Sequence, residues 1–391
     1  MTFPLDIPAP VRRQLPPGTG VVLGISGGVD SAVTLALLAH LGCEVQCVTF
    51  KNICFAEADD QAPVTACCSL DAITEARRQA ARFGVPHWVA DIEAPFRTRV
   101  IRPFIAEYAA GRTPNPCLYC NSTLRFPELV RLARRQGCAF AATGHYARLE
   151  PLPGGGSRLL KGVDEAKDQS YFLHRVDRNL WPQVVFPLGW YTKRQVRRAA
   201  AELGLAVAGK PDSQEICFVP DDDRSGLFGD LATAGHPATV PGEIVAADGR
   251  VLGRHRGLVH YTVGQRRGLG IAADRPLYVL ALDLPHSRLI VGYREELART
   301  VVGGDSFVAA VSGFPRRWHR GEVLSDAESP RVTLRIRHRH RGAEVAGWVL
   351  DGDRLEVTLV EPVDGAAPGQ GMVLYADDVV LGGARIRAAA Q

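Results

Sequence analysis

Residues 21–31 read VVLGISGGVDS, and this stretch decides the fold. An apolar run at residues 21–23 and 25 breaks at a pair of glycines, and apolar residues at helical spacing follow until Gly42. The pattern predicts a strand, a glycine turn and a helix. Adjacent glycines let the backbone bend with its amides pointing inward, and the helix adds the positive end of its dipole. We therefore predict that this turn binds phosphate.

The turn differs from the common nucleoside-triphosphate loop, because no lysine followed by serine or threonine comes after its last glycine. Asp30 supplies a carboxylate suited to Mg²⁺, and the hydroxyls of Ser26 and Ser31 suit phosphate oxygens. An ordinary strand-to-helix turn with serine caps is the alternative. The complete pattern resembles the pyrophosphate loop of enzymes that adenylate a substrate with ATP and release pyrophosphate.

Composition sets the class of protein. The 391 residues are 46% hydrophobic and 23% charged, so we expect two or three domains with their own cores. A net charge of +4 permits a nucleic-acid partner without requiring one. Prolines interrupt residues 1–19 and no stretch reaches membrane-spanning length, so we expect a cytoplasmic protein with no membrane association. Nine cysteines without an export signal indicate reduced thiols rather than disulfides.

Strands and helices alternate along the first half of the chain. We predict strands at 21–25, 44–50, 87–91 and 139–143, and helices at 31–41, 70–83, 97–110, 125–136 and 193–203. This order indicates an α/β domain with a doubly wound parallel sheet. In such a sheet the ligand lies beyond the carboxyl ends of the strands, so Gly144 is expected to face the first turn.

Ser69 is expected to begin the helix at 70–83. A capping box of Thr192 and Gln195 is expected to begin the helix at 193–203, and Gly204 to end it. The glycine-rich residues 153–157 are expected to form a hairpin tip or a short linker.

Later residues change to short strands separated by proline and glycine. We predict a proline-rich leader at 1–19, the nucleotide-binding domain at 20–219, a small β-rich domain at 220–296 and a β-barrel at 297–391.

A second unusual stretch is GRTPNPCLYCN at residues 111–121. Its two prolines are expected to keep the backbone out of a helix until about Ser122. Cys117 and Cys120 would then lie near the start of the helix that follows. A thiol at that position is expected to be reactive.

Neighbouring residues support that reactivity and leave alternatives open. Arg112 and Arg125 lie close to the two thiols in sequence. An inert pair and a zinc site are the alternatives, and zinc is the weaker one because no second CxxC exists and Cys67 and Cys68 are adjacent. Cys217 has apolar neighbours in the sequence, and this pattern alone predicts a buried core cysteine.

The stretch RVTLRIRHRHR at 331–341 alternates with a period of two. We predict a strand with the arginines at 331, 335, 337, 339 and 341 on one face and apolar residues on the other. Such a face suits phosphate groups of a nucleic acid. A solvated arginine face is the alternative.

Several stretches together resemble the bacterial tRNA-specific 2-thiouridylases. In order they are SGGVDS, GRTPNPCLYCN, ATGHY, KDQSYFL, DSQEICF, GLVHYTVGQRRGLG and the VVLGG near the carboxyl end. The resemblance runs from about residue 19 to the end of the chain. It implies an adenine nucleotide alpha hydrolase-like domain, a small central domain and a β-barrel that binds tRNA. It also implies ATP-dependent replacement of the C2 oxygen of uridine 34 by sulfur.

The resemblance assigns roles residue by residue. ATP would contact Gly24, Ile25, Ser26, Gly27, Gly28, Val29, Asp30, Ser31, Phe50 and Gly144. The target base would face Asn115, Pro116 and Cys117, and tRNA would contact Lys167, Asp168, Gln169, Arg337 and His338. Cys120 would be the nucleophile, and Cys217 would carry the persulfide. Mg²⁺ would accompany ATP.

The resemblance also implies partners. These are tRNAs for lysine, glutamate and glutamine, and a cysteine desulfurase or sulfur-relay protein that supplies the sulfur. The chain is expected to act as a monomer.

One position departs from the family pattern. Many members have aspartate where this chain has Cys117, and a thiol does not supply the standing charge of a carboxylate at neutral pH. The change creates a trio, Cys117, Cys120 and Cys217, able to hold three irons of a [4Fe-4S] cluster with an open fourth site. Thiolation through such a cluster is therefore one alternative, and another adenylating ligase is a second.

Overall fold

The computed structural model describes residues 3–53, 70–211, 216–219, 225–324 and 330–388. The chain forms two compact units, which we describe separately. The first unit comprises Met1–Arg99 and Tyr119–Asp222, and the second comprises Val100–Leu118 and Asp223–Gln391. Among the described residues, no helix has the length and apolar character needed to cross a membrane.

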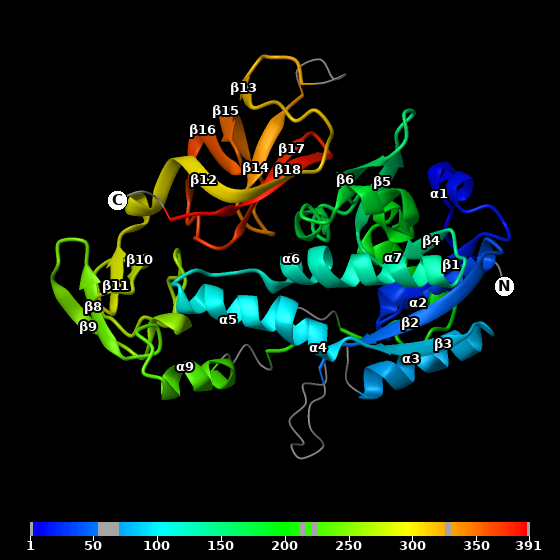
Figure 1. Cartoon of the computed structure of the whole chain (residues 1–391), viewed down its shortest axis with the longest axis horizontal. Coiled ribbons are helices and arrows are strands. Elements are labelled where there is room, and N and C mark those ends of the chain that lie inside the picture. The colour runs from blue at the N-terminus through cyan, green and yellow to red at the C-terminus, as the bar shows by residue number, and fades with distance from the viewer. Residues whose placement is uncertain (1–2, 54–69, 212–215, 220–224, 325–329, 389–391) are drawn as a thin grey trace. The chain divides into compact units, whose positions relative to one another are not determined.

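A five-stranded parallel sheet forms the centre of the first unit (Figure 1), in the order β3-β2-β1-β4-β7. Its strands are β1 (Gly20–Gly24), β2 (Glu44–Lys51), β3 (His87–Asp91), β4 (Phe140–Ala142) and β7 (Val184–Val185). Three consecutive residues of β1, at positions 21–23, are fully buried. A strand that is apolar without alternation is typical of a parallel sheet covered by helices. The fold predicted for this region is confirmed, with β7 as a strand that the sequence did not reveal.

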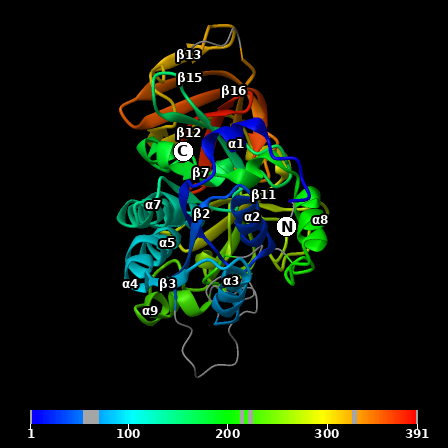
Figure 2. The same ribbon diagram turned by 90° about the vertical axis from the view of Figure 1, so that its right-hand side faces the viewer.

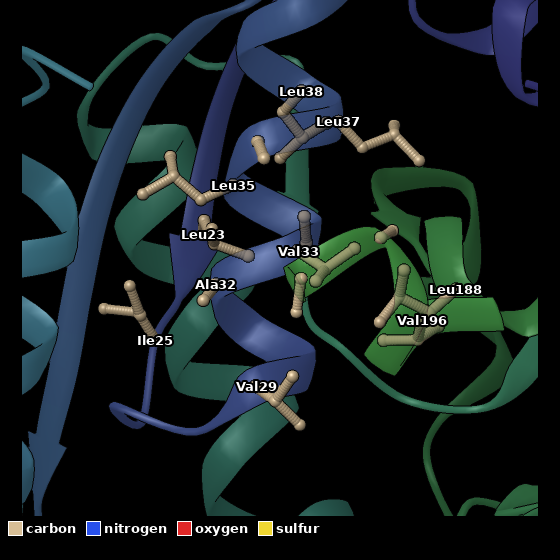
Figure 3. Close-up of a cluster of buried hydrophobic side chains, with 14 of the residues drawn as sticks. Leu23, Ile25, Val29, Ala32, Val33, Leu35, Leu37, Leu38, Leu188 and Val196 are labelled. Carbon is tan, nitrogen blue, oxygen red and sulfur yellow. The ribbon is translucent and has the colours of Figure 1, made fainter. Parts of the chain in front are cut away.

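Helices pack around this sheet. They are α1 (Ala9–Gln14), α2 (Val29–His40), α3 (Leu70–Arg82), α4 (Glu93–Phe96), α7 (Phe126–Arg135) and α8 (Lys193–Glu202). Figure 3 shows part of a buried hydrophobic cluster of this unit, with Val33 on the side of α2 toward Leu188 and Val196. A hairpin of β5 (Ala147–Pro151) and β6 (Ser157–Lys161) turns at the predicted glycine-rich tip.

Local signals placed some helix ends correctly. Thr192 and Gln195 form the predicted capping box of α8, with the Thr192 hydroxyl accepting from Gln195 N at 3.3 Å. Gly204, with φ of +62°, follows the end of α8 as expected. The expected cap of α3, Ser69, lies outside the described residues, as do Cys67 and Cys68.

Two sequence predictions in this part of the chain were wrong. The proline-rich leader contains α1, and residues Ile7, Val11 and Leu15 of the leader belong to the same buried cluster, because burial of these apolar side chains outweighed the prolines beside them. The helix expected from about Ser122 begins earlier, as α6 (Pro116–Cys120). Proline is well suited to the first position of a helix, since its amide has no intrahelical partner there.

The second unit contains two β structures. A four-stranded sheet has the order β10-β11-β8-β9, from β8 (Gly242–Ala246), β9 (Val251–His255), β10 (Tyr278–Asp283) and β11 (Arg288–Gly292). Its own core includes Ile244, Val279 and Leu289. Helices α5 (Arg102–Ala109) and α9 (Gly229–Thr233) belong to the same unit.

Six strands close into a barrel through pairing of the first strand with the last. They are β12 (Ala298–Ala309), β14 (Val332–Arg335), β15 (Ala343–Asp351), β16 (Arg354–Asp364), β17 (Gly371–Ala376) and β18 (Val379–Ile386), and β13 (Arg317–His319) pairs with β15. Several of these strands are drawn in orange and red in Figure 2. Closure leaves no unpaired edge among these six strands. The predicted barrel is confirmed.

The arginine-rich strand predicted at 331–341 is shorter than expected. Strand β14 ends at Arg335, which is buried with its guanidinium 4.9 Å from the ring centre of Tyr375. The chain then turns, with His340 N donating to Arg337 O at 3.0 Å and Gly342 at φ of +96°. The arginines therefore do not share one strand face.

Candidate active site

The glycine turn follows β1 directly and leads into α2. Ile25 N donates to Val48 O at 2.9 Å, which ties the start of the turn to β2. Gly27 has φ of +69°, and a Cβ at this position would lie 2.5 Å from the carbonyl oxygen of Ala72. Only glycine fits there. The predicted strand, turn and helix are confirmed.

The hydroxyl of Ser31 holds the turn closed. It donates to Gly28 O at 3.1 Å and accepts from Ser26 N at 3.3 Å. No side chain caps α2, whose N-cap residue is Gly28. The first amides of this helix and its dipole are therefore the groups best suited to an anion, while the Ser31 hydroxyl is engaged within the turn.

Gly144 faces the turn, as the sequence predicted. Strands β1 and β4 are parallel neighbours with Leu23 opposite Ala142, so their carboxyl ends lie together. A Cβ on Gly144 would lie 3.0 Å from the Cβ of Asp30. A larger residue at position 144 would press on the turn.

A cavity of about 210 Å³ opens at this edge of the sheet. It is lined by seven of the predicted ATP residues, which are Gly24, Ile25, Ser26, Asp30, Ser31, Phe50 and Gly144. It is also lined by residues that sequence reasoning missed or assigned elsewhere, which are Val48, Thr49, Asn52, Arg125, Leu129, Thr143, His145 and Gln169. Several of these follow the ends of β2 and β4, a signal that could have found them.

Asp30 is held by two side chains from distant parts of the chain. Lys193 Nζ donates to both carboxylate oxygens at 2.7 Å, and Tyr146 Oη donates to Oδ1 at 2.7 Å. Only 10% of the Lys193 side chain is exposed. Lys193 is the first residue of α8, and its amide donates to Asp164 Oδ2 at 2.8 Å. These contacts fix the start of α2 against the start of α8.

This arrangement does not fit Mg²⁺ at Asp30. The lysine ammonium occupies the position beside both carboxylate oxygens where a cation would bind. Within the described ranges, no three His, Cys, Asp or Glu side chains gather as a metal site. The sequence prediction of Asp30 as a Mg²⁺ ligand is therefore not supported by the geometry, which favours a positioning role for this carboxylate.

His145 contributes a neutral imidazole to the cavity. Its Nδ1 lies 2.7 Å from Thr143 Oγ1, and its ring packs 5.5 Å from that of Phe126. Burial, and secondarily the charge of Arg125, lower the pKa of His145 to about 3. The side chain is thus uncharged at neutral pH and can donate or accept a hydrogen bond without a charge.

The cysteines fall into two groups. Cys43 and Cys47 lie in the first unit, and burial raises the pKa of their thiols to about 11 and about 12. These two thiols are structural. Cys120 is buried, Cys217 is half-buried and Cys117 is exposed, and none of the three is joined in a disulfide. Cys120 and Cys217 both belong to the first unit.

The [4Fe-4S] hypothesis needs three of these thiols at one point. The described part of the chain contains no such group of metal-binding side chains. Cys117 lies three residues before Cys120 in α6, and its amide donates to Asn115 Oδ1 at 3.1 Å. We therefore derive no step through a cluster, and the [4Fe-4S] route stays a hypothesis.

Among the predicted tRNA contacts in the first unit, Asp168 is buried. Its carboxylate accepts from Gly162 N, Ser170 N and Ser170 Oγ at 2.9–3.0 Å. Gln169 Oε1 accepts from Tyr146 N at 2.9 Å, and Gln169 also lines the cavity. Asp168 therefore joins Gly162 to Ser170, and Gln169 positions the backbone of Tyr146. Their contact with tRNA, and that of Lys167, stays a prediction.

In the barrel, the turn after β14 carries Arg337, His338 and Arg339. The two arginines are exposed and His338 is half-buried. Arg337 Nη1 donates to Asp364 O at 3.2 Å, which orients this side chain along the turn. The predicted cationic segment is therefore present on a turn rather than along a strand, and its contact with tRNA stays a prediction.

The segment before Cys117 is anchored to the barrel within the second unit. Thr113 N donates to Pro368 O at 2.7 Å, and Gln370 Nε2 donates to Thr113 O at 2.8 Å. Arg112 forms a two-bond ion pair with Glu107, at 2.6 and 2.8 Å. The expectation that Arg112 activates a thiol is therefore not supported, because its guanidinium is paired with a carboxylate.

Comparison with known proteins gives consistent matches along the chain. A family model described as the tRNA methyl transferase HUP domain matches residues 19–221. Models described as the tRNA methyl transferase PRC-barrel domain and the aminomethyltransferase beta-barrel domain match residues 233–293 and 316–386.

Curated relatives match nearly the full length. A tRNA-specific 2-thiouridylase MnmA from Geobacter metallireducens is 43% identical over 94% of this chain and 97% of its own length. One from Rhizorhabdus wittichii is 44% identical over 95% of this chain and 92% of its own. A solved structure, the U34-tRNA thiolase NcsA from Methanococcus maripaludis, covers 58% of this chain and 73% of its own at 18% identity, with a TM-score of 0.34. The chain belongs to the MnmA family of tRNA-specific 2-thiouridylases.

Proposed function

We propose that this chain catalyses ATP-dependent 2-thiolation of uridine 34 in tRNA. The observation that carries the proposal is the SGGVDS turn at the carboxyl end of β1, with Gly144 facing it across the cavity, in a chain of the MnmA family. Residues 20–219 would perform the chemistry, and the barrel at 297–391 would contact tRNA. The reaction would take place in the cytoplasm, with the chain acting as a monomer.

The first step would be adenylation of the base. The C2 oxygen of uridine bonds to the α-phosphorus of ATP, the bond to pyrophosphate breaks, and the N3 proton leaves to solvent. The amides that begin α2 face the developing negative charge. Lys193 and Tyr146 hold Asp30, and so keep these amides in place. AMP then becomes a good leaving group on C2.

The second step would transfer sulfur. The terminal sulfur of a Cys217 persulfide bonds to C2, and the bond from C2 to AMP breaks. The Cys120 thiolate then attacks the Cys217 sulfur, which forms a disulfide and releases the thiocarbonyl as the base regains its proton. In a variant of this route, Cys120 attacks first and releases sulfide, which bonds to C2. A thiol reductant restores the cysteines, and a cysteine desulfurase or sulfur-relay protein restores the persulfide.

The description of the family model as a methyl transferase names a different chemistry. We favour thiolation because full-length relatives are named 2-thiouridylases, and because Cys120 and Cys217 are cysteines outside any disulfide in the same unit as the turn. Methyl transfer would need neither a pyrophosphate-type turn nor two thiols.

The proposal is tested by incubating the protein with ATP, persulfide donor and unmodified tRNA. We expect one pyrophosphate released for each 2-thiouridine found by mass spectrometry, with tRNAs for lysine, glutamate and glutamine as substrates. Pyrophosphate release that does not depend on tRNA would favour another adenylating ligase. Activity that follows the content of iron and labile sulfide after anaerobic purification would favour the cluster.

A further inference from the structure

One side chain of the cavity is buried with an unused hydrogen-bond acceptor. Asn52 is 2% exposed, and its Oδ1 has no hydrogen-bond partner among the described residues. Three other buried atoms share this condition, on Gln79, His87 and His174, but only Asn52 lines the cavity at the glycine turn. A buried polar atom without a partner costs stability, so its presence at a ligand cavity needs an explanation.

Asn52 lies at the end of the cavity away from the glycine turn. Strand β2 runs parallel to β1, with Val48 opposite Gly24, where the turn begins. Asn52 follows four residues later, just past the end of β2, which places it about 13 Å along the strand direction at 3.3 Å per residue. With the phosphates at the turn, the far end of the cavity is left for the base.

The chemistry of the cavity agrees with this orientation. Apolar side chains of Val48, Phe50 and Leu129 line it, and such side chains suit the faces of a purine ring. An amide oxygen accepts hydrogen bonds, so it repels phosphate oxygens and suits an N–H donor. The exocyclic amino group of adenine is the donor that distinguishes this base from a purine with no substituent at C6.

We propose that Asn52 is a specificity-determining residue, whose Oδ1 accepts a hydrogen bond from the exocyclic amino group of the adenine of ATP. The inference rests on the proposed ATP-dependent function. It explains why the fold retains a buried unpaired oxygen that a leucine of similar volume would avoid. Nucleotide binding then satisfies the group that folding leaves unpaired.

The test compares binding of ATP with binding of purine ribonucleoside triphosphate, which lacks only the amino group. Isothermal titration calorimetry on the full chain should show ATP bound about tenfold more tightly, the worth of one hydrogen bond. Purine ribonucleoside triphosphate is a sharper probe than GTP, because a rotated amide could donate its NH₂ to the 6-oxo group of guanine.

The variant Asn52→Leu should bind both nucleotides equally, near the weaker wild-type affinity. Its melting temperature without nucleotide should be equal to or above that of the wild type, since the unpaired oxygen is removed. Gln79→Leu is the matched control, because Gln79 also has a buried amide oxygen without a partner but does not line this cavity. This control should keep the tenfold preference.

Three results would overturn the inference. Equal affinity of the wild type for the two nucleotides would show that no residue accepts a hydrogen bond from the amino group. This result does not depend on whether any variant folds. If Asn52→Leu still bound ATP ten times more tightly than purine ribonucleoside triphosphate, another residue would be the one that recognises the amino group. Failure of the wild type to bind ATP at all would overturn the proposed function together with this inference. The other two results would overturn only this inference.

Discussion

Arg385 of β18 donates to the carboxylate of Glu107 of α5 at 2.9 Å, although 278 positions separate them in the sequence. Arg385 also donates to Asp305 Oδ1 at 2.9 Å, and Glu107 accepts two further bonds from Arg112. The Glu107 side chain is 9% exposed. This network fixes the segment that leads to Cys117 onto the barrel of the second unit.

Glu107→Gln should therefore loosen this segment. Removing the buried carboxylate leaves Arg112 and Arg385 without their shared anion. We expect a loss of about 3 kcal/mol in the free energy of unfolding, the lower end for a broken buried ion pair, because Arg385 keeps its bond to Asp305. Hydrogen exchange should rise at residues 111–117, and the thiolation rate should fall while ATP affinity is unchanged. Denaturant titration, hydrogen exchange and calorimetry measure the three effects.

Arg288→Gln provides the control for this prediction. It removes an ion pair of similar chemistry in the same unit, between Arg288 and Glu243 at 3.2 Å, but both side chains are largely exposed. Little change is expected. Equal destabilisation by the two substitutions would mean that the Glu107 network has no special role.

Lys193→Met should weaken ATP binding by about tenfold. The substitution leaves the Asp30 carboxylate, which is 31% exposed, without the ammonium that holds it at the start of α2. The double variant Asp30→Asn with Lys193→Met should be little worse than either single variant, because both remove the same interaction. Calorimetry on all four proteins provides the test, and additive losses would contradict the coupling.

The substitution Asp30→Asn distinguishes a positioning role of this carboxylate from a role as a metal ligand. If the carboxylate acts through Lys193 and Tyr146, Asp30→Asn should lower ATP affinity without moving the Mg²⁺ concentration that gives half-maximal pyrophosphate release. A metal ligand at this position would shift that midpoint upward on substitution. A Mg²⁺ titration of the wild type and the variant therefore decides between the two roles.

The sequence predicted the turn and its surroundings well because their signals are local. Two glycines, the strand before them and the periodic helix after them lie within twenty residues, and Gly144 follows from the rule that ligands bind at the carboxyl ends of parallel strands. The capping box of α8 is local too. It indicated where α8 begins, but it could not indicate that Lys193 reaches an aspartate 163 positions away.

The sequence predictions that were wrong share a physical cause. Alternation at 331–341 predicted one strand face, yet Arg335 is buried against the ring of Tyr375, a residue from another strand. Prolines at residues 1–19 suggested a leader, yet Ile7, Val11 and Leu15 belong to a buried cluster that extends to Leu188 and Val196. In each case a long-range contact outweighed a local pattern.

The sulfur chemistry makes a prediction about the cysteines. Cys120→Ser and Cys217→Ser should abolish 2-thiouridine formation while tRNA-dependent pyrophosphate release continues, since adenylation comes before either thiol acts. Cys138→Ser should keep both activities, because burial raises the pKa of the Cys138 thiol and makes it a poor nucleophile. Mass spectrometry of the tRNA and a pyrophosphate assay report the two steps separately. Thiolation that survives in either Cys120→Ser or Cys217→Ser would remove this mechanism.

His174 should make the protein sensitive to acid. It is buried with Nδ1 donating to Tyr171 O at 2.7 Å, and burial lowers its pKa to about 3. Between pH 6.5 and 3 the unfolded chain binds a proton at this residue that the folded chain does not, so stability falls as the pH drops through this range. The loss is at most about 1.4 kcal/mol per pH unit. His174→Asn should flatten the pH dependence of the unfolding free energy, and parallel curves for the two proteins would refute the assignment.

The exposed turn after β14 should make electrostatic contacts with tRNA. Arg337→Ala combined with Arg339→Ala removes two cations, so tRNA should bind more weakly at all sequences, and the slope of log affinity against log salt should fall by about 1.4–1.8. Arg354→Gln is the control, because it removes one exposed guanidinium from the start of β16, outside the turn. If the control changes the slope as much per charge as the turn does, the barrel attracts tRNA by its general field and the turn has no particular role. If only the turn variant changes the slope, tRNA phosphates lie against Arg337 and Arg339.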